Sequence, residues 1–253
     1  MQVSVITLFP EWVEQVTKFG MPRVAAEQGA LALNLVNPRD FAENPWRRID
    51  RRPYGGGPGM VMEAEPLARA IAAARSVSAG PVVALTPQGE RFTQAWAERL
   101  VAGGGMTLLC GRYEGWDARL DAGLAPDAPI DVELSVGDVV LSGGELGAMM
   151  VIDACARLLP GVLGDENSSV EDSFSSGALD HPHYARPAEW RGQAVPEVLM
   201  SGDHAAIRRW RRQQALARTW ERRPDLLDGL VLSPDEQEWL RAYIAQHAID
   251  AKR

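Results

Sequence analysis

Cysteine and lysine are scarce in this chain of 253 residues. The two cysteines, Cys110 and Cys155, both lie inside apolar stretches, so we expect small buried hydrophobic residues and neither a disulfide framework nor a cysteine metal cluster. Lys18 and Lys252 are the only lysines among 26 basic residues. Arginine therefore supplies nearly all of the positive charge.

Long apolar runs are missing as well. No stretch approaches the roughly 18 consecutive apolar residues of a membrane-spanning helix, and the N-terminal segment lacks the basic start and apolar middle of a secretory signal peptide. We therefore expect a cytoplasmic protein without a membrane partner. Hydrophobic residues at 46% and charged residues at 24% are typical of a globular chain, whose length allows one large domain or two modest ones.

The acidic total hides a basic segment near the C-terminal end. The 34 acidic and 26 basic side chains give a net charge of −8, which argues weakly against a nucleic-acid partner. Residues 208–223 nevertheless read RRWRRQQALARTWERR, with seven arginines and one acid, Glu221. Because local charge decides whether a phosphate backbone can dock, nucleic acid remains a candidate partner.

The first two thirds of the sequence alternate between strand-like and helix-like segments, the pattern of an α/β fold. Five strands are predicted, of which the last three are continuous apolar runs typical of a parallel sheet covered on both faces: residues 3–9, 31–35, 81–85, 106–110 and 138–141. Helices are predicted at residues 10–19, 66–75, 93–101 and 145–158. Gly20 is expected to end the first of these helices.

The composition changes after Gly164, where the segment DENSSVEDSFSSG is polar and rich in serine. The remainder is helical in pattern, with Asp203 expected to cap one helix and Ser233 to begin another through a capping box with Glu236. The predicted organisation is an α/β domain over residues 1–163, a flexible linker over 164–176 and a small all-α domain over 177–253.

Polar, glycine-containing loops follow the three buried strands, at residues 86–89, 111–115 and 142–145. If those strands are parallel, the loops meet at the carboxyl edge of the sheet, where open α/β sheets bind ligands. Glycines allow the backbone to approach a ligand closely, so the loops predict a small-molecule pocket read largely by main chain. The alternative is that the glycines only make tight turns.

Common nucleotide, metal and hydrolase motifs are missing. The glycine-dense segment 53–60 has no Gly-Lys-Ser/Thr ending, and the glycines at 103–105 precede a strand, so neither is a nucleotide-binding loop. His181 and His183 are the one close histidine pair and have no cysteine nearby, so no metal site is predicted. No Gly-x-Ser-x-Gly elbow occurs.

Asp172 and Arg157 are candidates for chemistry at the pocket. Asp172 is followed by Ser173 and Phe174, and this apolar anchor could fold the linker back against the sheet and hold a carboxylate there as a general base. The alternative is a solvated linker acid. Arg157 ends an apolar helix and is either a surface arginine or a cation aimed at a ligand.

Eight short motifs, in this order along the chain, resemble the bacterial tRNA (guanine-N1)-methyltransferases. They span from about residue 5 to about residue 224. The motifs are LFP at 8–10, RPYGGGPGM at 52–60, CGRYEG at 110–115, SGGEL at 142–146, PGVLG at 160–164, EDSF at 171–174, PHY at 182–184 and IRRW at 207–210. Each is weak alone, but all eight in the correct order are specific.

The resemblance implies an α/β methyltransferase domain of the SPOUT superfamily with a trefoil knot, a small helical C-terminal domain and a homodimer. It implies transfer of a methyl group from S-adenosylmethionine to N1 of the guanosine directly 3′ of the anticodon (tRNA position 37). The partner would be the anticodon stem-loop of tRNA and not DNA. Family members also depend on Mg²⁺, although no ligand cluster for it is visible in the sequence.

The resemblance also implies roles for individual residues. Asp172 matches the general base and Arg157 a catalytic arginine. The matching cofactor residues are Leu85, Thr86, Pro87, Gly111, Arg112, Tyr113, Glu114, Gly115, Val136, Gly137, Leu141, Ser142, Gly143, Gly144 and Gly147. The matching tRNA-binding residues are Arg52, Tyr54, Gly57, Gly59, His183, Arg208, Arg209, Arg211 and Arg212. The chain departs from the family at Arg51, where an acid is more common, and at Gly147, where proline is common.

The chemistry agrees with this interpretation. Guanine N1 carries a proton that must leave as the nitrogen attacks a methyl group, which requires a base, and negative charge at O6 requires a cation or hydrogen-bond donor. The base edge is accessible in an anticodon loop. Two alternatives remain: a SPOUT methyltransferase acting on another RNA position, and a non-catalytic RNA-binding protein.

Overall fold

The computed structural model of the protein describes residues 1–121, 129–164 and 172–250. For residues 248–250 it describes the backbone only. The chain forms two compact units, Met1–Glu166 and Asn167–Arg253, which we describe separately. Much of the predicted linker, residues 165–171, lies outside the described residues.

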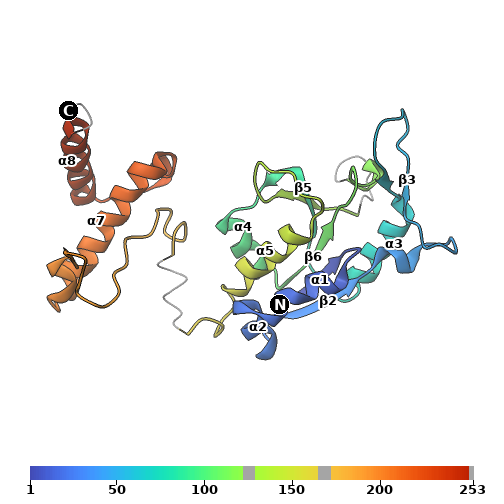
Figure 1. The fold of residues 1–253 in the computed structure, drawn as a ribbon, viewed down its shortest axis with the longest axis horizontal. Helices are drawn as coiled ribbons and strands as arrows, with labels where there is room; N and C mark the ends of the chain where they lie inside the picture. Colours follow the sequence, from blue (N-terminus) through green and yellow to red (C-terminus); the bar gives the residue numbers. More distant parts are fainter. Residues whose placement is uncertain (122–128, 165–171, 251–253) are drawn as a thin grey trace. The chain divides into compact units, whose positions relative to one another are not determined.

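A parallel five-stranded sheet forms the centre of the first unit (Figure 1). The strand order is β2-β1-β6-β5-β7, and all four pairings are parallel. The bounds are β1 Gln2–Ile6, β2 Ala32–Val36, β5 Val82–Arg91, β6 Gly105–Cys110 and β7 Val132–Ser135. Every residue of the central strand β6 is buried, as its continuous apolar run predicts for a sheet covered on both faces.

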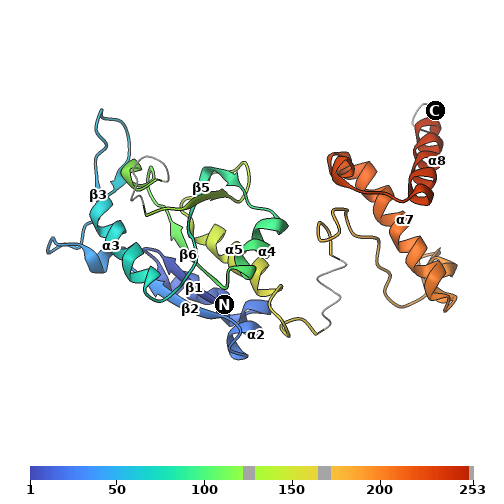
Figure 2. The ribbon, with the colours of Figure 1, turned by 180° about the vertical axis from the view of Figure 1, so that it is seen from behind.

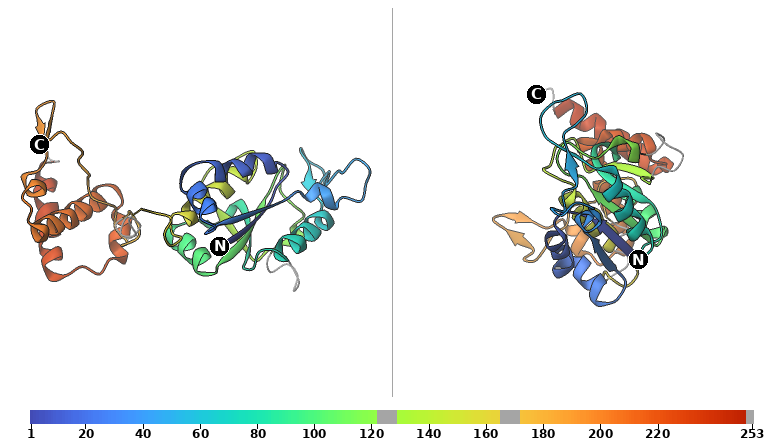
Figure 3. Two further views of the ribbon diagram at one scale, coloured as in Figure 1. Left: turned by 90° about the horizontal axis from the view of Figure 1, so that it is seen from below. Right: turned by 90° about the vertical axis from the view of Figure 1, so that its right-hand side faces the viewer.

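Helices cover both faces of this sheet (Figure 3). One face packs against α1 (Pro10–Glu14), α2 (Gly20–Glu27), α4 (Gln94–Ala102) and α5 (Glu145–Ala156), with Val5 and Leu108 in the shared core. The other face packs against α3 (Ala64–Arg75), which contributes Leu67 and Ile71 to a second core. Short 3-10 turns lie at Gln15–Lys18, Pro38–Phe41 and Ala118–Leu120.

Two local predictions are wrong. The apolar run 138–141 is not a strand, because β7 occupies the sheet edge six residues earlier and Val140 is 87% exposed. Gly20 does not end the helical region but begins α2, and its φ of +59° provides the left-handed turn between Lys18 and the new helix.

The second unit is mainly helical (Figure 2). Its long helices are α7 (His204–Arg222) and α8 (Pro234–Asp250), with 3-10 turns at Glu197–Met200 and Pro224–Gly229. The Asp203 carboxylate accepts hydrogen bonds from the amides of Ala205 and Ala206, which confirms the predicted cap.

The predicted capping box at the start of α8 is also present. The Glu236 amide donates to Ser233 Oγ, and the Ser233 amide donates to the Glu236 carboxylate.

Two small hairpins complete the fold. In the second unit, β8 (Glu189–Trp190) pairs antiparallel with β9 (Gln193–Ala194), a hairpin that the expectation of an all-α domain missed because each strand has only two residues. In the first unit, β3 (Asp50–Arg51) pairs antiparallel with β4 (Val61–Met62). Over the described part of the chain, no helix is both long and apolar enough to cross a membrane.

Candidate functional site

A pocket of about 370 Å³ lies beside the carboxyl ends of β6 and β7 and the second half of β5. Its walls include the loops that follow β6 and β7. The predicted loop at residues 86–89 is wrong, because these residues continue β5, whose pairing with β7 shifts register between Leu85 and Glu90. Every residue that the resemblance matches to cofactor binding lines it: Leu85, Thr86, Pro87, Gly111, Arg112, Tyr113, Glu114, Gly115, Val136, Gly137, Leu141, Ser142, Gly143, Gly144 and Gly147. The structure therefore brings these residues together, as the parallel strand order requires.

Six further residues line the pocket that the residue-by-residue match did not name: Gln88, Trp116, Leu134, Ser135, Val139 and Val140. Gln88 lies within the predicted pocket segment 86–89. Two of them explain the wrong strand. Val139 and Val140 line the pocket and are exposed, and a periodicity argument cannot distinguish such a pocket segment from a buried strand.

Close backbone contacts explain two of the glycines. The Gly144 amide donates to the carbonyl of Gly111 at 3.0 Å, and a Cβ on Gly144 would lie 2.7 Å from Cys110 Cα. A Cβ on Gly143 would collide with the Arg112 guanidinium. The loop after β6 and the loop before α5 can pack this closely only without side chains at these positions.

Glu145, buried behind the pocket lining, holds Arg112 in place at the pocket wall. The Glu145 side chain is fully buried and accepts a hydrogen bond from Thr7 Oγ1 at 2.9 Å. Arg112 binds both carboxylate oxygens, through Nε at 3.2 Å and Nη2 at 3.0 Å, while its Nη1 donates to the Ser142 carbonyl. The Arg112 guanidinium also lies 4.4 Å from the Phe9 ring centroid. The sequence contained a signal for Glu145, a carboxylate that opens a mainly apolar helix.

The cysteines contribute no nucleophile. Burial first, and then the neighbouring Glu145 carboxylate, raise the pKa of the Cys110 thiol well above its usual range. Burial raises the pKa of Cys155 to about 12. Both thiols are buried and free, which confirms the expectation of small hydrophobic residues.

The two candidate catalytic residues belong to different units. Arg157 is half-buried at the C-terminal end of α5 in the first unit, whereas Asp172 is a partly exposed residue of the second. Within the second unit, the Phe174 amide donates to the Ala178 carbonyl, and the Phe174 ring lies 6.0 Å from the Arg223 guanidinium. The roles of Arg157 and Asp172 thus remain predictions from the resemblance.

The β3–β4 hairpin carries the glycine-dense segment and is joined to the pocket. The Met62 amide donates to the Gly115 carbonyl at 2.9 Å, and the Glu114 amide donates to the Met60 carbonyl at 3.0 Å. Tyr54 is fully exposed at the hairpin, near Arg52 on the same surface hollow. Gly57 and Gly59 have positive φ angles that shape its tip. Arg51, the departure from the family pattern, binds Glu63 at 2.9 Å.

The arginines of α7 differ in their surroundings. Arg208 and Arg209 are exposed, whereas Arg212 Nε lies 2.6 Å from Glu236 Oε1 of α8. Arg211 is half-buried and lines a hollow that it shares with His183. Arg208 and Arg209 are therefore the members of this set best placed to meet a phosphate.

A parallel sheet with glycine-containing loops around a pocket at its carboxyl edge defines an α/β ligand-binding domain, joined here to a helical unit with exposed arginines. The chain belongs to a family with the SPOUT fold, since the family profile described as "tRNA (Guanine-1)-methyltransferase TrmD" matches residues 1–229.

Full-length relatives agree with this assignment. A tRNA (guanine-N(1)-)-methyltransferase of Halorhodospira halophila is 53% identical over 253 residues, covering 99% of this chain and 94% of its own length. Proteins of the same name from Chromobacterium violaceum and Dechloromonas aromatica are 50% and 54% identical, covering 100% and 93% of this chain and 99% and 93% of their own lengths.

Proposed function

We propose that this protein transfers a methyl group from S-adenosylmethionine to N1 of the guanosine directly 3′ of the anticodon in tRNA. The observation that carries the proposal is the family membership along residues 1–229, supported by relatives of the same name that are at least 50% identical. The resemblance of the motifs, from about residue 5 to about residue 224, supplies the choice of guanosine.

The pocket fits the methyl donor in size and in chemistry. Its volume of about 370 Å³ lies within the range of small-molecule sites. Leu85, Val139 and Leu141 offer apolar surface for a purine ring, and the loops at 111–115 and 142–144 offer backbone amides and carbonyls for its polar edge. S-adenosylmethionine supplies an electrophilic methyl group bound to a sulfonium sulfur.

The remaining chemistry belongs to the chain's own residues. We assign to the Asp172 carboxylate the removal of the N1 proton as the N1–carbon bond forms and the sulfur–carbon bond breaks, with that electron pair passing to sulfur. We assign to Arg157 the stabilisation of negative charge on guanine O6. Glu145 is a positioning residue, because it holds Arg112 at the pocket wall.

The RNA is held by groups outside the pocket. Arg208 and Arg209 suit phosphates, and Tyr54 offers an exposed ring on which a base can stack. The other residues assigned to RNA are Arg52, Gly57, Gly59, His183, Arg211 and Arg212. We further propose a homodimer in the cytoplasm.

We assign the family's Mg²⁺ dependence to the RNA. Mg²⁺ prefers oxygen ligands in octahedral geometry and commonly binds through phosphates. The one metal-type cluster among the described side chains contains two histidines, which do not match that preference.

A methyl-mapping experiment tests the proposal. The protein is incubated with radiolabelled S-adenosylmethionine and a tRNA transcript with guanosine after the anticodon, and with a matched transcript carrying adenosine there. We expect label at N1 of that guanosine and none in the adenosine transcript. Label on a ribose or another base would indicate a different RNA target, and RNA binding without methyl transfer would indicate a non-catalytic RNA-binding protein.

A further inference from the structure

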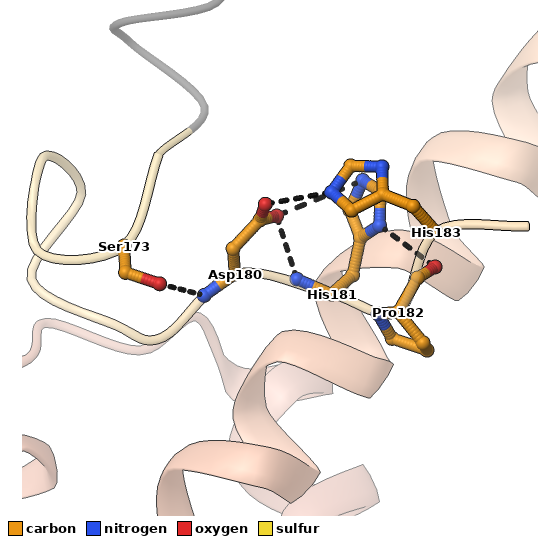
Figure 4. A network of polar contacts seen from close by, with 5 residues as sticks. All are labelled: Ser173, Asp180, His181, Pro182 and His183. Atoms are coloured by element: carbon orange, nitrogen blue, oxygen red, sulfur yellow. Dashed lines mark hydrogen bonds and ion pairs between the residues drawn. The ribbon is translucent and has the colours of Figure 1, made fainter.

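Asp180, His181 and His183 bring three potential metal ligands together in the second unit (Figure 4). We propose that they bind one divalent transition-metal ion of the Zn²⁺ class. One ligand atom from each residue lies within 4.8 Å of the other two. His183 Nε2 is 2.7 Å from Asp180 Oδ2, and His181 Nε2 is 3.9 Å from Asp180 Oδ1.

These separations suit a tetrahedral ion. Ligand atoms about 2.0–2.1 Å from a tetrahedral metal lie roughly 3.3 Å from one another. The two observed nitrogen–oxygen distances lie on either side of this value and involve different oxygens of the Asp180 carboxylate, so a rotation of that carboxylate would bring one oxygen to both histidines. The His183 side chain is 69% exposed, so its ring can rotate to widen the shorter contact. The metal replaces the proton that now links His183 to Asp180.

His181 provides the observation that points to a ligand. The residue is 8% exposed, and its Nδ1 lies 3.2 Å from the Pro182 carbonyl. A carbonyl only accepts hydrogen bonds, so Nδ1 carries a proton, and in the neutral tautomer the lone pair is then on Nε2. That buried Nε2 has no hydrogen-bond partner among the residues that the structure describes. A buried polar atom in this state calls for an explanation, and a metal ion supplies one.

The neighbouring hydrogen bonds have the arrangement of an outer coordination shell. Metal-bound histidines commonly donate their second ring N–H to a backbone carbonyl, as His181 does to Pro182. The Asp180 carboxylate accepts from the His181 amide at 2.6 Å, and the Asp180 amide donates to Ser173 Oγ at 2.9 Å. These bonds orient the carboxylate and one imidazole before any ion arrives.

The ligand set selects the type of ion. Two imidazole nitrogens and one carboxylate oxygen suit Zn²⁺, Co²⁺ or Ni²⁺, whereas Mg²⁺ and Ca²⁺ prefer oxygen ligands. A fourth position is left for water. The prediction of no metal site considered the histidine pair without Asp180, the residue that completes the set.

Metal binding is measured on full-length, metal-free protein that carries no polyhistidine tag. Zn²⁺ is titrated by calorimetry, and Co²⁺ by its visible absorption, whose intensity distinguishes four-coordinate from six-coordinate ions. We expect one ion per chain and four-coordinate Co²⁺ bands. His183→Gln and Asp180→Asn should each weaken Zn²⁺ binding more than about tenfold. Loss of an outer-shell hydrogen-bond partner already weakens metal binding by about tenfold, and loss of a direct ligand should weaken it further. His204→Gln removes a histidine outside the cluster and should bind as the unaltered chain does.

Equal affinity and stoichiometry in the unaltered chain and in His183→Gln would overturn the proposal, as would absence of stoichiometric Zn²⁺ uptake. Circular dichroism verifies that the variants fold. A second measurement needs no variant: the ¹⁵N resonance of His181 Nε2 should shift on addition of Zn²⁺, and an unchanged resonance at saturating Zn²⁺ would contradict the assignment. Because neither readout involves methyl transfer, failure of this proposal is distinguishable from failure of the proposed function.

Discussion

Glu145 is the clearest case of a single residue whose environment gives it a role. A fully buried carboxylate is destabilising unless it is paired, and here the Arg112 guanidinium forms an ion pair with it while Thr7 and Arg112 donate hydrogen bonds to its Oε1. Since Arg112 in turn holds the Ser142 carbonyl, the pair joins the start of α5 to two pocket loops. The pocket geometry therefore depends on a residue that itself lies beneath the lining.

Glu145→Gln should weaken both the fold and cofactor binding. The amide keeps the shape but leaves the Arg112 guanidinium, 15% exposed, without its counter-charge, which should cost about 1–3 kcal/mol of unfolding free energy. Urea unfolding and calorimetry with S-adenosylmethionine measure the two effects. The matched control is Glu65→Gln, which removes an exposed partner of Arg69 and should change stability by less than about 1 kcal/mol. Equal results for the two variants would refute a positioning role for Glu145.

Gly143→Val should damage the pocket directly, because a side chain there collides with Arg112. We expect S-adenosylmethionine binding to weaken by about 1–3 kcal/mol, the scale of overpacking in a filled site. Gly164→Ala is the control, since nothing lies within 4 Å of a Cβ at that position. Unchanged affinity in Gly143→Val, with normal circular dichroism, would remove this loop from the cofactor site.

At the scale of elements, local sequence patterns predicted what depends on local physics. The apolar run that opens β5 and the run that became β6 are buried on both faces, and the caps at Asp203 and Ser233 form as their side chains predict. The run 138–141 was wrongly predicted as a strand because in the folded protein it lines the pocket. The actual strand β7 was missed because its half-buried Glu133 interrupts the apolar pattern. The metal-type cluster escaped because the geometry of Asp180 relative to two histidines is not readable from spacing alone.

The arginine face of α7 predicts salt-dependent tRNA binding. If roughly four arginines meet phosphates of single-stranded RNA, the slope of log K against log salt is about −3. Replacing Arg208 and Arg209 together by alanine should reduce its magnitude by about 1.4. Arg241→Ala, an exposed arginine on α8, should leave the slope unchanged. A slope near zero in the unaltered protein, or one insensitive to the double replacement, would instead indicate a solvated helix face.

At the scale of the whole molecule, the resemblance supplied the fold and the family because its eight motifs are spread along the chain, and the matching profile covers residues 1–229. The knot, the dimer and the division at residues 163 and 176 remain predictions, since composition and spacing carry no information about threading or about a second chain. The first unit nevertheless has an exposed apolar surface that could form the interface of the proposed dimer. Trp12, Leu146 and Met150 are exposed apolar residues on the contacting helices α1 and α5.

Met150→Glu should dissociate the proposed homodimer, because a carboxylate would be buried without a partner in an apolar interface. Light scattering after size-exclusion chromatography should give twice the chain mass of 27.6 kDa for the unaltered protein and the single mass for the variant. Val231→Glu is the control, since Val231 is 96% exposed in the second unit. A monomeric unaltered protein, or a dimer that tolerates Met150→Glu, would place the interface elsewhere.

The assignment of Asp172 as general base is the central claim, and the single-turnover rate of Asp172→Asn tests it most directly. The amide keeps the shape but cannot accept the N1 proton, so the rate at saturating tRNA and S-adenosylmethionine should fall roughly 10²–10⁴-fold while cofactor affinity stays within about threefold. A rate within about threefold of the unaltered protein, accompanied by weaker tRNA and cofactor binding, would show that Asp172 orders the chain and does not remove the proton.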